Sequence, residues 1–332
     1  MELKDQLLDL VQSHLSVSQI ARKLNLPKWQ AFSLFRLHGV PTPLAYARSF
    51  LTEDYLREKI KAGATLKEIA TTTRTRIPVV QGMLQKYGLK TDQQLHREEI
   101  LKLQASNLTP LEKGAIVGTL LGDAWLMKYS DSHYVMGIQQ CEVQKAYAIF
   151  KAKTLLSHLF LQDCYTIPYN SAIDKWIRST SYRFLSISHP YLKFAYETMN
   201  VTGKKEVTPE ILTDLTLLGI ALWFGDDGSA NLGDKSYYFS TNSFSKESLH
   251  LLREHLFKKC NVKTNLIKAS NFNKKEAYQL RVASPSVEQF EKIIGPYICM
   301  LPGVNYKYKG FYIKNPQRLY VKDLLVDEKI KI

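Results

Sequence analysis

Two aspartates, Asp123 and Asp227, hold matching positions in a stretch of sequence that occurs twice. The two copies, 108–123 and 212–227, align without a gap, begin with Leu-Thr and are mostly apolar. If each copy is a helix, its aspartate lies at the carboxyl end, where the helix dipole disfavours an anion. A cation is the natural compensation for two such carboxylates held side by side, and hard divalent cations prefer carboxylate oxygens. The pattern therefore predicts a divalent-metal site.

For either copy alone, a purely structural role is the more common one. An apolar helix that ends in Asp-Gly, as at 227–228, is usually a core helix that leads into a turn. The gapless duplication, with the acid at the same place in both copies, favours function over that alternative. The apolar run is also far shorter than the run of about 20 residues that a membrane-spanning helix needs.

Local signals mark where the two helices begin. Thr109, Pro110 and Glu112 occupy the N-cap, first-turn and capping-box positions of a helix start. In the second copy, Thr213 is the residue that we expect to cap the helix in the same way.

Three glycines, Gly114, Gly118 and Gly122, lie four residues apart on one stripe of the first helix. Each glycine costs a helix about 1 kcal/mol relative to alanine, so three of them need a reason. Close approach of another backbone is such a reason. We expect the second helix to be that partner, with Ala221 and Gly225 on its facing stripe.

The same two stretches resemble the signatures of a known family. Residues 116–124 (IVGTLLGDA) and 220–228 (IALWFGDDG) look like the two signatures of a monomeric LAGLIDADG homing endonuclease. The first copy has Ala124 in place of the final glycine. The second has Leu222 in place of the small third residue, and an additional acid, Asp226.

The resemblance covers residues 108–315 and implies an α+β fold of two pseudo-symmetric αββαββα repeats, 108–205 and 206–315. Their antiparallel sheets would form a saddle on DNA, and residues 316–332 would be a C-terminal tail. The strands expected from residue types and alternation are at 132–139, 165–167, 181–187, 236–241, 265–269 and 277–282. The helices expected between them are at 142–160, 190–200, 246–259 and 286–297.

A second, shorter repeat fills residues 1–90, where Ser16–Ala21 matches Thr65–Ala70. Each unit is expected to have three helices, the second capped by Ser or Thr and the third ended by glycine. We therefore predict an all-α region of two helix-turn-helix-like modules, followed by a polar linker at 91–107, for which a partly helical structure stays open. The first and third helices are expected at 3–13 and 28–38, and at 53–62 and 77–87.

In a helix-turn-helix module the third helix enters the major groove with its N-terminal half. Three-helix units also serve as plain packing domains, but a tandem pair in a basic chain favours DNA binding. The candidate readers of DNA are Lys28, Gln30 and Ser33 in the first module and Arg74, Arg76 and Gln81 in the second.

Side-chain alternation indicates which sheet residues face DNA. In 278–282 the apolar set is Tyr278, Leu280 and Val282, so Gln279 and Arg281 point the other way. Arginine and glutamine make the base contacts expected in the major groove, although a phosphate or solvent contact is the alternative for each. The further candidates are Gln139, Arg178, Arg183, Asn242, Lys268, Lys274 and Lys275. Gln139 and Asn242 follow Asp123 and Asp227 closely enough in the sequence to help position water or metal.

Lysines near the cleaved phosphates are a further property of the family that the chain resembles. The resemblance assigns this role to Lys205, before the second signature, and to Lys307, at the matching place in the second half. Lys204 is the alternative to Lys205. Without the resemblance, such short lysine runs are typical of a surface cluster. The catalytic residues expected from the resemblance are then Lys205, Lys307, Asp123 and Asp227.

The composition of the chain favours a polyanionic partner. It has 332 residues and a formal net charge of +14, which indicates nucleic acid first. An anionic membrane surface is the second choice, but we find no basic amphipathic anchor, signal peptide or membrane-spanning segment. The four cysteines form no metal-binding pair, as expected of an intracellular protein in a bacterial cytoplasm or an organelle matrix.

The activity that the resemblance implies is double-strand cleavage of DNA at a long recognition site by a monomer. Mg²⁺ (or Mn²⁺), bound by Asp123 and Asp227, would activate water and stabilise the leaving oxygen. Two other functions remain open. One is a DNA-binding regulator that does not cut, which the presence of both acids disfavours. The other is a maturase that assists the splicing of an intron RNA, which the sequence does not separate from an endonuclease.

Overall fold

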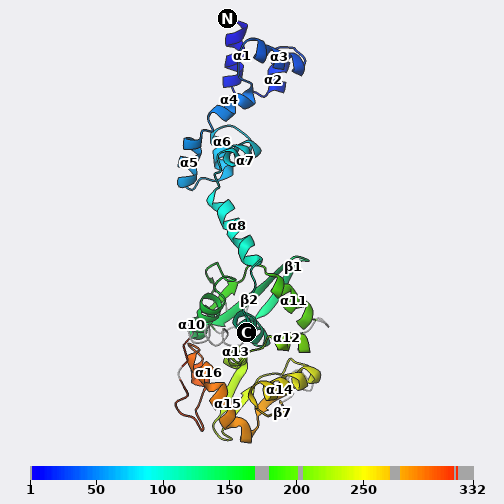
Figure 1. The fold of residues 1–332 in the computed structure, drawn as a ribbon, viewed down its shortest axis with the longest axis vertical. Helices are drawn as coiled ribbons and strands as arrows, with labels where there is room; N and C mark the ends of the chain where they lie inside the picture. The colour runs from blue at the N-terminus through cyan, green and yellow to red at the C-terminus, as the bar shows by residue number, and fades with distance from the viewer. Residues whose placement is uncertain (1, 169–178, 201–204, 270–276, 318, 321–332) are drawn as a thin grey trace. The chain divides into compact units, whose positions relative to one another are not determined.

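The computed structural model describes residues 2–168, 179–200, 205–269, 277–317 and 319–320. The chain divides into two compact units, Met1–Leu101 and Lys102–Ile332 (Figure 1). No helix within the described residues is long and apolar enough to cross a membrane.

The described part of the N-terminal unit is all helical and contains two modules, each with an apolar core of its own. The core of the first module is formed by Leu7, Leu10, Val11, Ile20, Phe35 and Val40. The core of the second is formed by Leu51, Leu56, Ile69, Ala70, Val80, Met83 and Leu84. The helices are α1 (Leu3–Gln12), α2 (Val17–Lys23), α3 (Lys28–Leu37), α4 (Pro43–Ser49), α5 (Glu53–Lys61), α6 (Leu66–Thr72), α7 (Ile77–Lys86) and α8 (Asp92–Gln104).

The second helix of each module begins at a capping box. Ser16 and Gln19 exchange hydrogen bonds between side chain and main chain at the start of α2. Thr65 and Glu68 do the same at the start of α6. Each bond satisfies a main-chain N–H that has no partner within the helix. The caps predicted for these two helices are thereby confirmed.

The third helix of each module ends before a glycine. Gly39 and Gly88 both have a φ of 65°, a left-handed conformation that glycine adopts without strain. The three-helix pattern predicted for each module is confirmed. Helix α4 was not predicted. Helix α8 occupies most of the segment 91–107, in agreement with the partly helical alternative for the linker.

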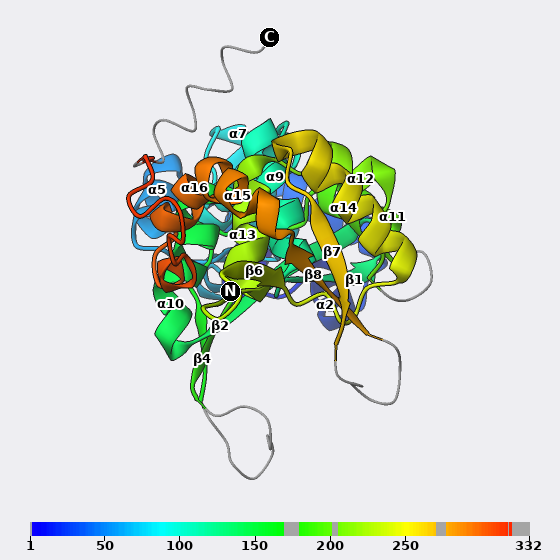
Figure 2. The same cartoon turned by 90° about the horizontal axis from the view of Figure 1, so that it is seen from below.

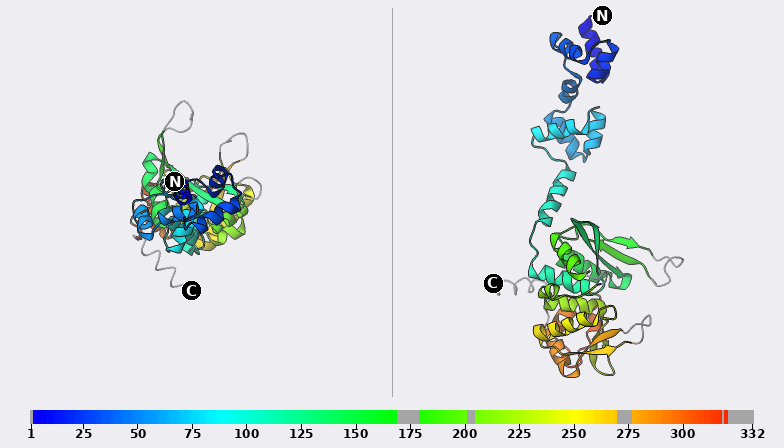
Figure 3. Two further views of the ribbon diagram at one scale, coloured as in Figure 1. Left: turned by 90° about the horizontal axis from the view of Figure 1, so that it is seen from above. Right: turned by 90° about the vertical axis from the view of Figure 1, so that its right-hand side faces the viewer.

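Two four-stranded antiparallel sheets lie on one side of the C-terminal unit, and most of its helices lie on the other (Figure 2 and Figure 3). The strand orders β1-β2-β4-β3 and β5-β6-β8-β7 show the same topology twice. The predicted α+β fold with two repeats is confirmed. The strands are β1 (Trp125–Ser130), β2 (His133–Cys141), β3 (Tyr165–Ile167), β4 (Ser181–Leu185), β5 (Gly228–Asn231), β6 (Ser236–Phe239), β7 (Thr264–Lys268) and β8 (Tyr278–Val282). The helices are α9 (Pro110–Leu121), α10 (Lys145–Ile149), α11 (Pro190–Met199), α12 (Pro209–Thr213), α13 (Leu217–Asp227), α14 (Lys246–Cys260), α15 (Val287–Ile293) and α16 (Gly295–Met300).

Helices α9 and α13 pack against each other at the centre of this unit and join the two repeats (Figure 2). A Cβ atom added at Gly118 would lie 2.0 Å from the main-chain oxygen of Gly219, so the two backbones touch. A Cβ at Gly114 would lie 2.2 Å from the side-chain oxygen of Thr216. The glycine stripe of α9 is therefore a helix contact, as predicted.

Two details of this helix pair differ from the prediction. The residues of α13 that meet the glycines of α9 are Thr216, Gly219 and Asp226, and the predicted Gly225 is not among them. Gly225 faces the ring of Tyr147 instead, where an added Cβ would lie 2.5 Å from the hydroxyl oxygen. Thr216 also caps α13, because the predicted cap, Thr213, is the last residue of the short helix α12.

Other departures concern single elements. The helix predicted at 142–160 is shorter, since α10 passes into a π-helical segment, Phe150–Leu155. The helix predicted at 286–297 is two helices, because Pro296 at the start of α16 cannot continue α15. Strands β1 and β5 were not among those expected. The exposure of β1 changes from half-buried to exposed along the strand without alternating.

Candidate active site

The two aspartates predicted to hold a metal lie at the carboxyl ends of α9 and α13. Asp123 follows Gly122, which ends α9, and is exposed. Asp227 is the last residue of α13 and is half-buried. A Cβ at Gly122 would lie 2.4 Å from the Cβ of Asp226, so the two helix ends meet and bring both acids to the same end of the pair.

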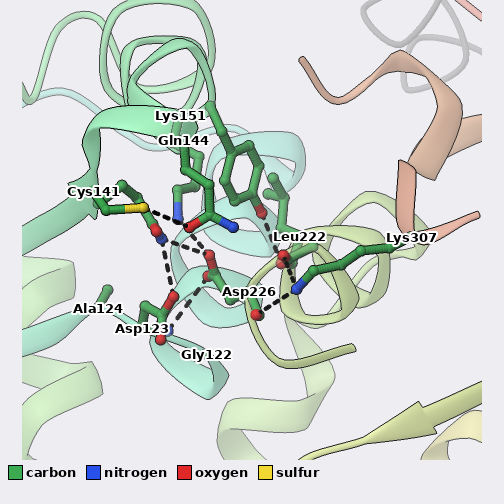
Figure 4. Close-up of polar contacts among 12 residues, drawn as sticks. Gly122, Asp123, Ala124, Cys141, Gln144, Lys151, Leu222, Asp226 and Lys307 are labelled. Atoms are coloured by element: carbon green, nitrogen blue, oxygen red, sulfur yellow. Dashed lines mark hydrogen bonds and ion pairs between the residues drawn. The ribbon is translucent and has the colours of Figure 1, made fainter. Parts of the chain in front are cut away.

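A third acid, Asp226, lies between them with its side chain fully buried. Its Oδ1 accepts hydrogen bonds from Lys151 Nζ at 2.8 Å and from Gln140 Nε2 at 3.0 Å. Its Oδ2 accepts one from the main-chain N–H of Asp123 at 3.4 Å. Figure 4 shows Asp226 between Lys151 and Asp123. In the sequence this acid was only a departure from the family pattern.

Gln140 takes the place beside the acids that we had suggested for Gln139. Its Nε2 donates to Asp123 Oδ2 at 3.0 Å as well as to Asp226. Gln139 points to the other face of the sheet, since successive side chains of a strand alternate. There its Oε1 accepts from Arg183 Nη2 at 2.8 Å. The suggestion that Gln139 lies near the acids is therefore wrong.

Each of the two predicted lysines binds the main chain just before an acid. Lys205 Nζ donates to the carbonyl oxygen of Gly122 at 2.9 Å, which precedes Asp123. Lys307 Nζ donates to the carbonyl oxygen of Asp226 at 2.7 Å, which precedes Asp227. The two lysines thus have corresponding places in the two repeats. The alternative to the first, Lys204, lies outside the described residues.

The segment that carries Lys307 is anchored by a buried carboxylate. Glu291 of α15 is fully buried, and its two oxygens accept the three main-chain N–H groups of residues 311–313 at 2.6–2.8 Å. The hydroxyl of Tyr237 also donates to Glu291 at 2.7 Å. These bonds tie the chain that follows the lysine to the core of the second repeat.

The electrostatics of the site reflect crowded acids. Burial, and then the negative charges of Asp123 and Asp226, raise the pKa of Asp227 to about 7. Burial lowers the pKa of Lys205 and of Lys307, and the three nearby carboxylates oppose that effect. At Asp227 the repulsion by the two neighbouring carboxylates exceeds the attraction of the two lysines, which is a setting that a bound cation would stabilise.

The donors at the two helix ends fit a hard cation. Within the described ranges, no group of three or more His, Cys, Asp or Glu side chains is arranged to hold a metal ion. The carboxylates of Asp123 and Asp227 lie at the two helix ends and are the donors available to a cation. Oxygen donors of this kind suit Mg²⁺ or Mn²⁺, which complete their shells with water and phosphate oxygens.

The candidate DNA contacts on the sheets lie on the predicted strands or beside them. Leu280 and Val282 are buried and Gln279 and Arg281 are half-buried, as alternation predicted. Arg281 pairs with Asp234 at 3.2 Å. The exposed Lys268 ends β7. Asn242 lies in an exposed turn after β6, while Arg178, Lys274 and Lys275 fall outside the described residues.

The candidate DNA contacts of the N-terminal unit lie at or near the starts of the third helices. Lys28 is the exposed first residue of α3, and Arg76 is the exposed N-cap of α7. Arg74 is exposed in the turn before α7, with a φ of 50°. The remaining candidates are the half-buried Gln30 and the exposed Ser33 and Gln81.

Comparisons with known proteins agree on a family. The family model described as "LAGLIDADG DNA endonuclease family" matches residues 113–290. Cytochrome b mRNA maturase bI2 of Saccharomyces cerevisiae (strain ATCC 204508 / S288c) is 27% identical over 218 residues, which are 62% of this chain and 50% of the maturase. The chain therefore spans half the length of that relative. DNA endonuclease I-ChuI of Chlamydomonas applanata is 26% identical over 226 residues, which are 61% of this chain and 99% of the relative.

One solved structure supports the fold. The homing endonuclease I-WcaI, bound to its DNA recognition sequence, is 20% identical and superposes with a TM-score of 0.53. The match covers 66% of this chain and 94% of that protein.

Proposed function

Because this chain belongs to the LAGLIDADG DNA endonuclease family, we propose that it is a site-specific DNA endonuclease that makes double-strand breaks at a long recognition site. The observation that carries the proposal is the pairing of acids and lysines. At each helix end a lysine Nζ binds the carbonyl oxygen that precedes an acid. A helix pair that served only as a core would have no need of these four charged groups.

We propose that Asp123 and Asp227 hold Mg²⁺ or Mn²⁺. A bound cation of this kind lowers the pKa of water and stabilises charge on phosphate oxygens. The ammonium groups of Lys205 and Lys307 lie at the same helix ends, where they would offset the negative charge of an attacked phosphate. Both acids come from one chain, so one copy of the protein would be sufficient and we propose that it acts as a monomer.

The DNA surface in this proposal has two parts. In the C-terminal unit, Gln139, Arg183, Gln279 and Arg281 on the sheets would contact bases or phosphates. In the N-terminal unit, the starts of α3 and α7 would enter the major groove. The net charge of +14 suits such a partner. A DNA substrate would require a compartment that contains DNA, such as a bacterial cytoplasm or an organelle matrix.

A maturase that assists the splicing of an intron RNA is the second candidate. The observation that favours it is the 27% identity to the yeast maturase. A basic sheet surface would serve either nucleic acid, so only an activity measurement separates the two functions. A regulator that binds DNA without cutting is the third candidate, and the presence of both acids disfavours it.

A cleavage assay tests the proposal. Its substrate is a supercoiled plasmid that carries the junction of the two DNA segments flanking this coding element in its natural genome (the junction plasmid). We expect a linear product with Mg²⁺ and none with EDTA. Failure of the folded protein to cut this plasmid with Mg²⁺ or Mn²⁺ would contradict the proposal. Accelerated splicing of the intron transcript without DNA cleavage would support the maturase instead.

A further inference from the structure

We propose that the buried ion pair of Lys151 and Asp226 positions Asp123 alone, so that the two halves of the active site are built differently. Cleavage of one DNA strand would then depend on this pair more than cleavage of the other. The inference rests on the endonuclease function proposed above. Lys151, Asp226 and Gln140 are positioning residues in it, because they act through Asp123 and not on the DNA.

The ion pair is sealed from solvent. Both side chains are 0% exposed, and Lys151 Nζ lies 2.8 Å from Asp226 Oδ1. The same Nζ lies 4.2 Å from the centre of the Tyr147 ring. Two charges taken out of water are costly to hold, and apolar residues of the same size often stabilise a fold as well or better. The pair therefore needs a reason other than stability.

The contacts of Asp226 lead to Asp123 by two routes. One route is the hydrogen bond from the main-chain N–H of Asp123 to Asp226 Oδ2. The other passes through Gln140, whose Nε2 lies 3.0 Å from both Asp226 Oδ1 and Asp123 Oδ2. Partners of this kind fix the orientation of a carboxylate that holds a metal.

The corresponding positions of the other half lack these groups. In the alignment of the two helices Asp226 corresponds to Gly122, which has no side chain and so leaves room for Asp226. In the register of the two sheets Gln140 corresponds to Thr241, whose hydroxyl donates to the carbonyl oxygen of Tyr278 at 2.9 Å. Within the described part of the chain, the Asp227 carboxylate accepts no hydrogen bond. The support is therefore one-sided, whereas the two lysines that bind the helix ends correspond to each other.

Local backbone geometry gives independent support. Lys151 belongs to the π-helical segment Phe150–Leu155, which continues α10. Such segments are rare in proteins, and many of those that occur lie at functional sites. In the second repeat the corresponding helix, α14, is α-helical along its whole length, Lys246–Cys260.

The test measures the rate of the first cut on each strand of the junction plasmid. In the double variant Lys151→Met, Asp226→Asn both buried charges are removed together, because either change alone leaves the other charge without its partner. We expect one strand to be cut about ten- to a hundredfold more slowly, as is typical when the partner of a metal ligand is lost. The other strand should be cut at nearly the wild-type rate. Nicked circles should accumulate, always with the nick in the same strand.

Two single variants sharpen the test. Gln140→Leu interrupts one route without touching the ion pair and should slow the same strand. Thr241→Val, at the corresponding position of the other half, is the matched control and should leave the ratio of the two strand rates unchanged. Melting temperatures, and binding to the plasmid site in EDTA, show whether each variant is folded.

A second measurement does not depend on cutting. Calorimetric titration of the protein–DNA complex with Ca²⁺ should show that one site of the wild type is weakened about tenfold in the double variant. Unchanged Ca²⁺ affinity, equal slowing of both strands, or unchanged cutting of both strands by the folded double variant would overturn the proposal. If the double variant does not fold, Gln140→Leu decides between the same outcomes. A wild-type protein that cuts neither strand would contradict the endonuclease function, and the Ca²⁺ titration would still test the positioning of Asp123.

Discussion

The chain contains two duplications, and they are built in opposite ways. In the N-terminal unit each module encloses its own apolar core. In the C-terminal unit both repeats contribute to one core, which runs through α9 and α13. The two modules should therefore unfold independently of each other, whereas the two repeats should unfold together as one cooperative unit. A shared core also lets two halves build one site, while separate modules can only add binding surface.

The largest effect should come from Gly118→Leu, which acts on the contact that joins the repeats. Leucine favours a helix by nearly 1 kcal/mol over glycine, but overpacking typically costs about 1–3 kcal/mol, and more where a backbone cannot move. Since the added Cβ would lie 2.0 Å from the Gly219 oxygen, we expect a lower melting temperature. Cleavage should be lost too, because about 1 Å of displacement spoils in-line geometry.

The control for this variant is Gly82→Leu in α7, where an added Cβ meets nothing within 4 Å. It should leave the protein as stable as the wild type or slightly more stable, in a thermal unfolding experiment. A stabilised and fully active Gly118→Leu protein would contradict the description of α9 and α13 as a close-packed pair.

Asp123→Asn and Asp227→Asn test whether the repeats share one active site. Each exchange keeps the size of the side chain and removes its charge, so folding and DNA binding should persist. Either variant alone should abolish double-strand cutting of the junction plasmid, because the half of the site that carries the exchange then lacks its charged oxygen donor and one strand stays uncut. Normal double-strand cutting by both single variants would end the endonuclease assignment.

Deletion of residues 1–90 should have a smaller effect, since it removes separate modules. We expect the remaining chain to fold and to cut with Mg²⁺. Its affinity for the junction DNA should fall by about a hundredfold, the gain that linked binding modules typically provide. Binding should also depend less on salt, because fewer phosphates are contacted. Fluorescence anisotropy at several salt concentrations measures both; a truncated protein that does not fold would show that the units are interdependent.

The smallest effects should come from two equivalent helix caps. Ser16→Ala and Thr109→Ala each remove a capping-box hydroxyl and should cost about 1 kcal/mol. Hydrogen exchange should show the loss only in the first module for Ser16→Ala, and throughout the C-terminal unit for Thr109→Ala. Protection lost in both N-terminal modules after Ser16→Ala would mean that the modules are coupled.

Features that depend on spacing within one segment could be predicted from the sequence. The capping box of Thr109 and the glycine stripe of α9 are of this kind. The partner of the stripe could not be predicted, because the crossing of two helices depends on the side chains of both. The contact accordingly falls on Gly219 and not on the predicted Gly225. The cap of α13 was also missed, because either of two nearby threonines, Thr213 and Thr216, has the right chemistry.

The site residues that were missed come from other parts of the chain. Gln140 continues the buried set of Met136 and Ile138 on β2, and a polar residue on that face was a usable signal. Lys151 gave no signal, because a lysine in a helix is almost always exposed. Its burial depends on a π-helical segment and on Asp226, 75 residues further along the chain.

The anchoring of the Lys307 segment by Glu291 affects when a newly made molecule becomes competent to cut. Lys307 binds carbonyl oxygens that lie 81 and 82 residues earlier in the chain. Domains fold in order as they leave the ribosome, N-terminal ones first. The N-terminal modules can therefore reach their folded state before the codon for Lys307 has been read, whereas the two acids belong to a core that extends to Val304. A nascent chain acquires its binding modules early, and its active site gains the last lysine only when residues 307–313 have been released from the ribosome.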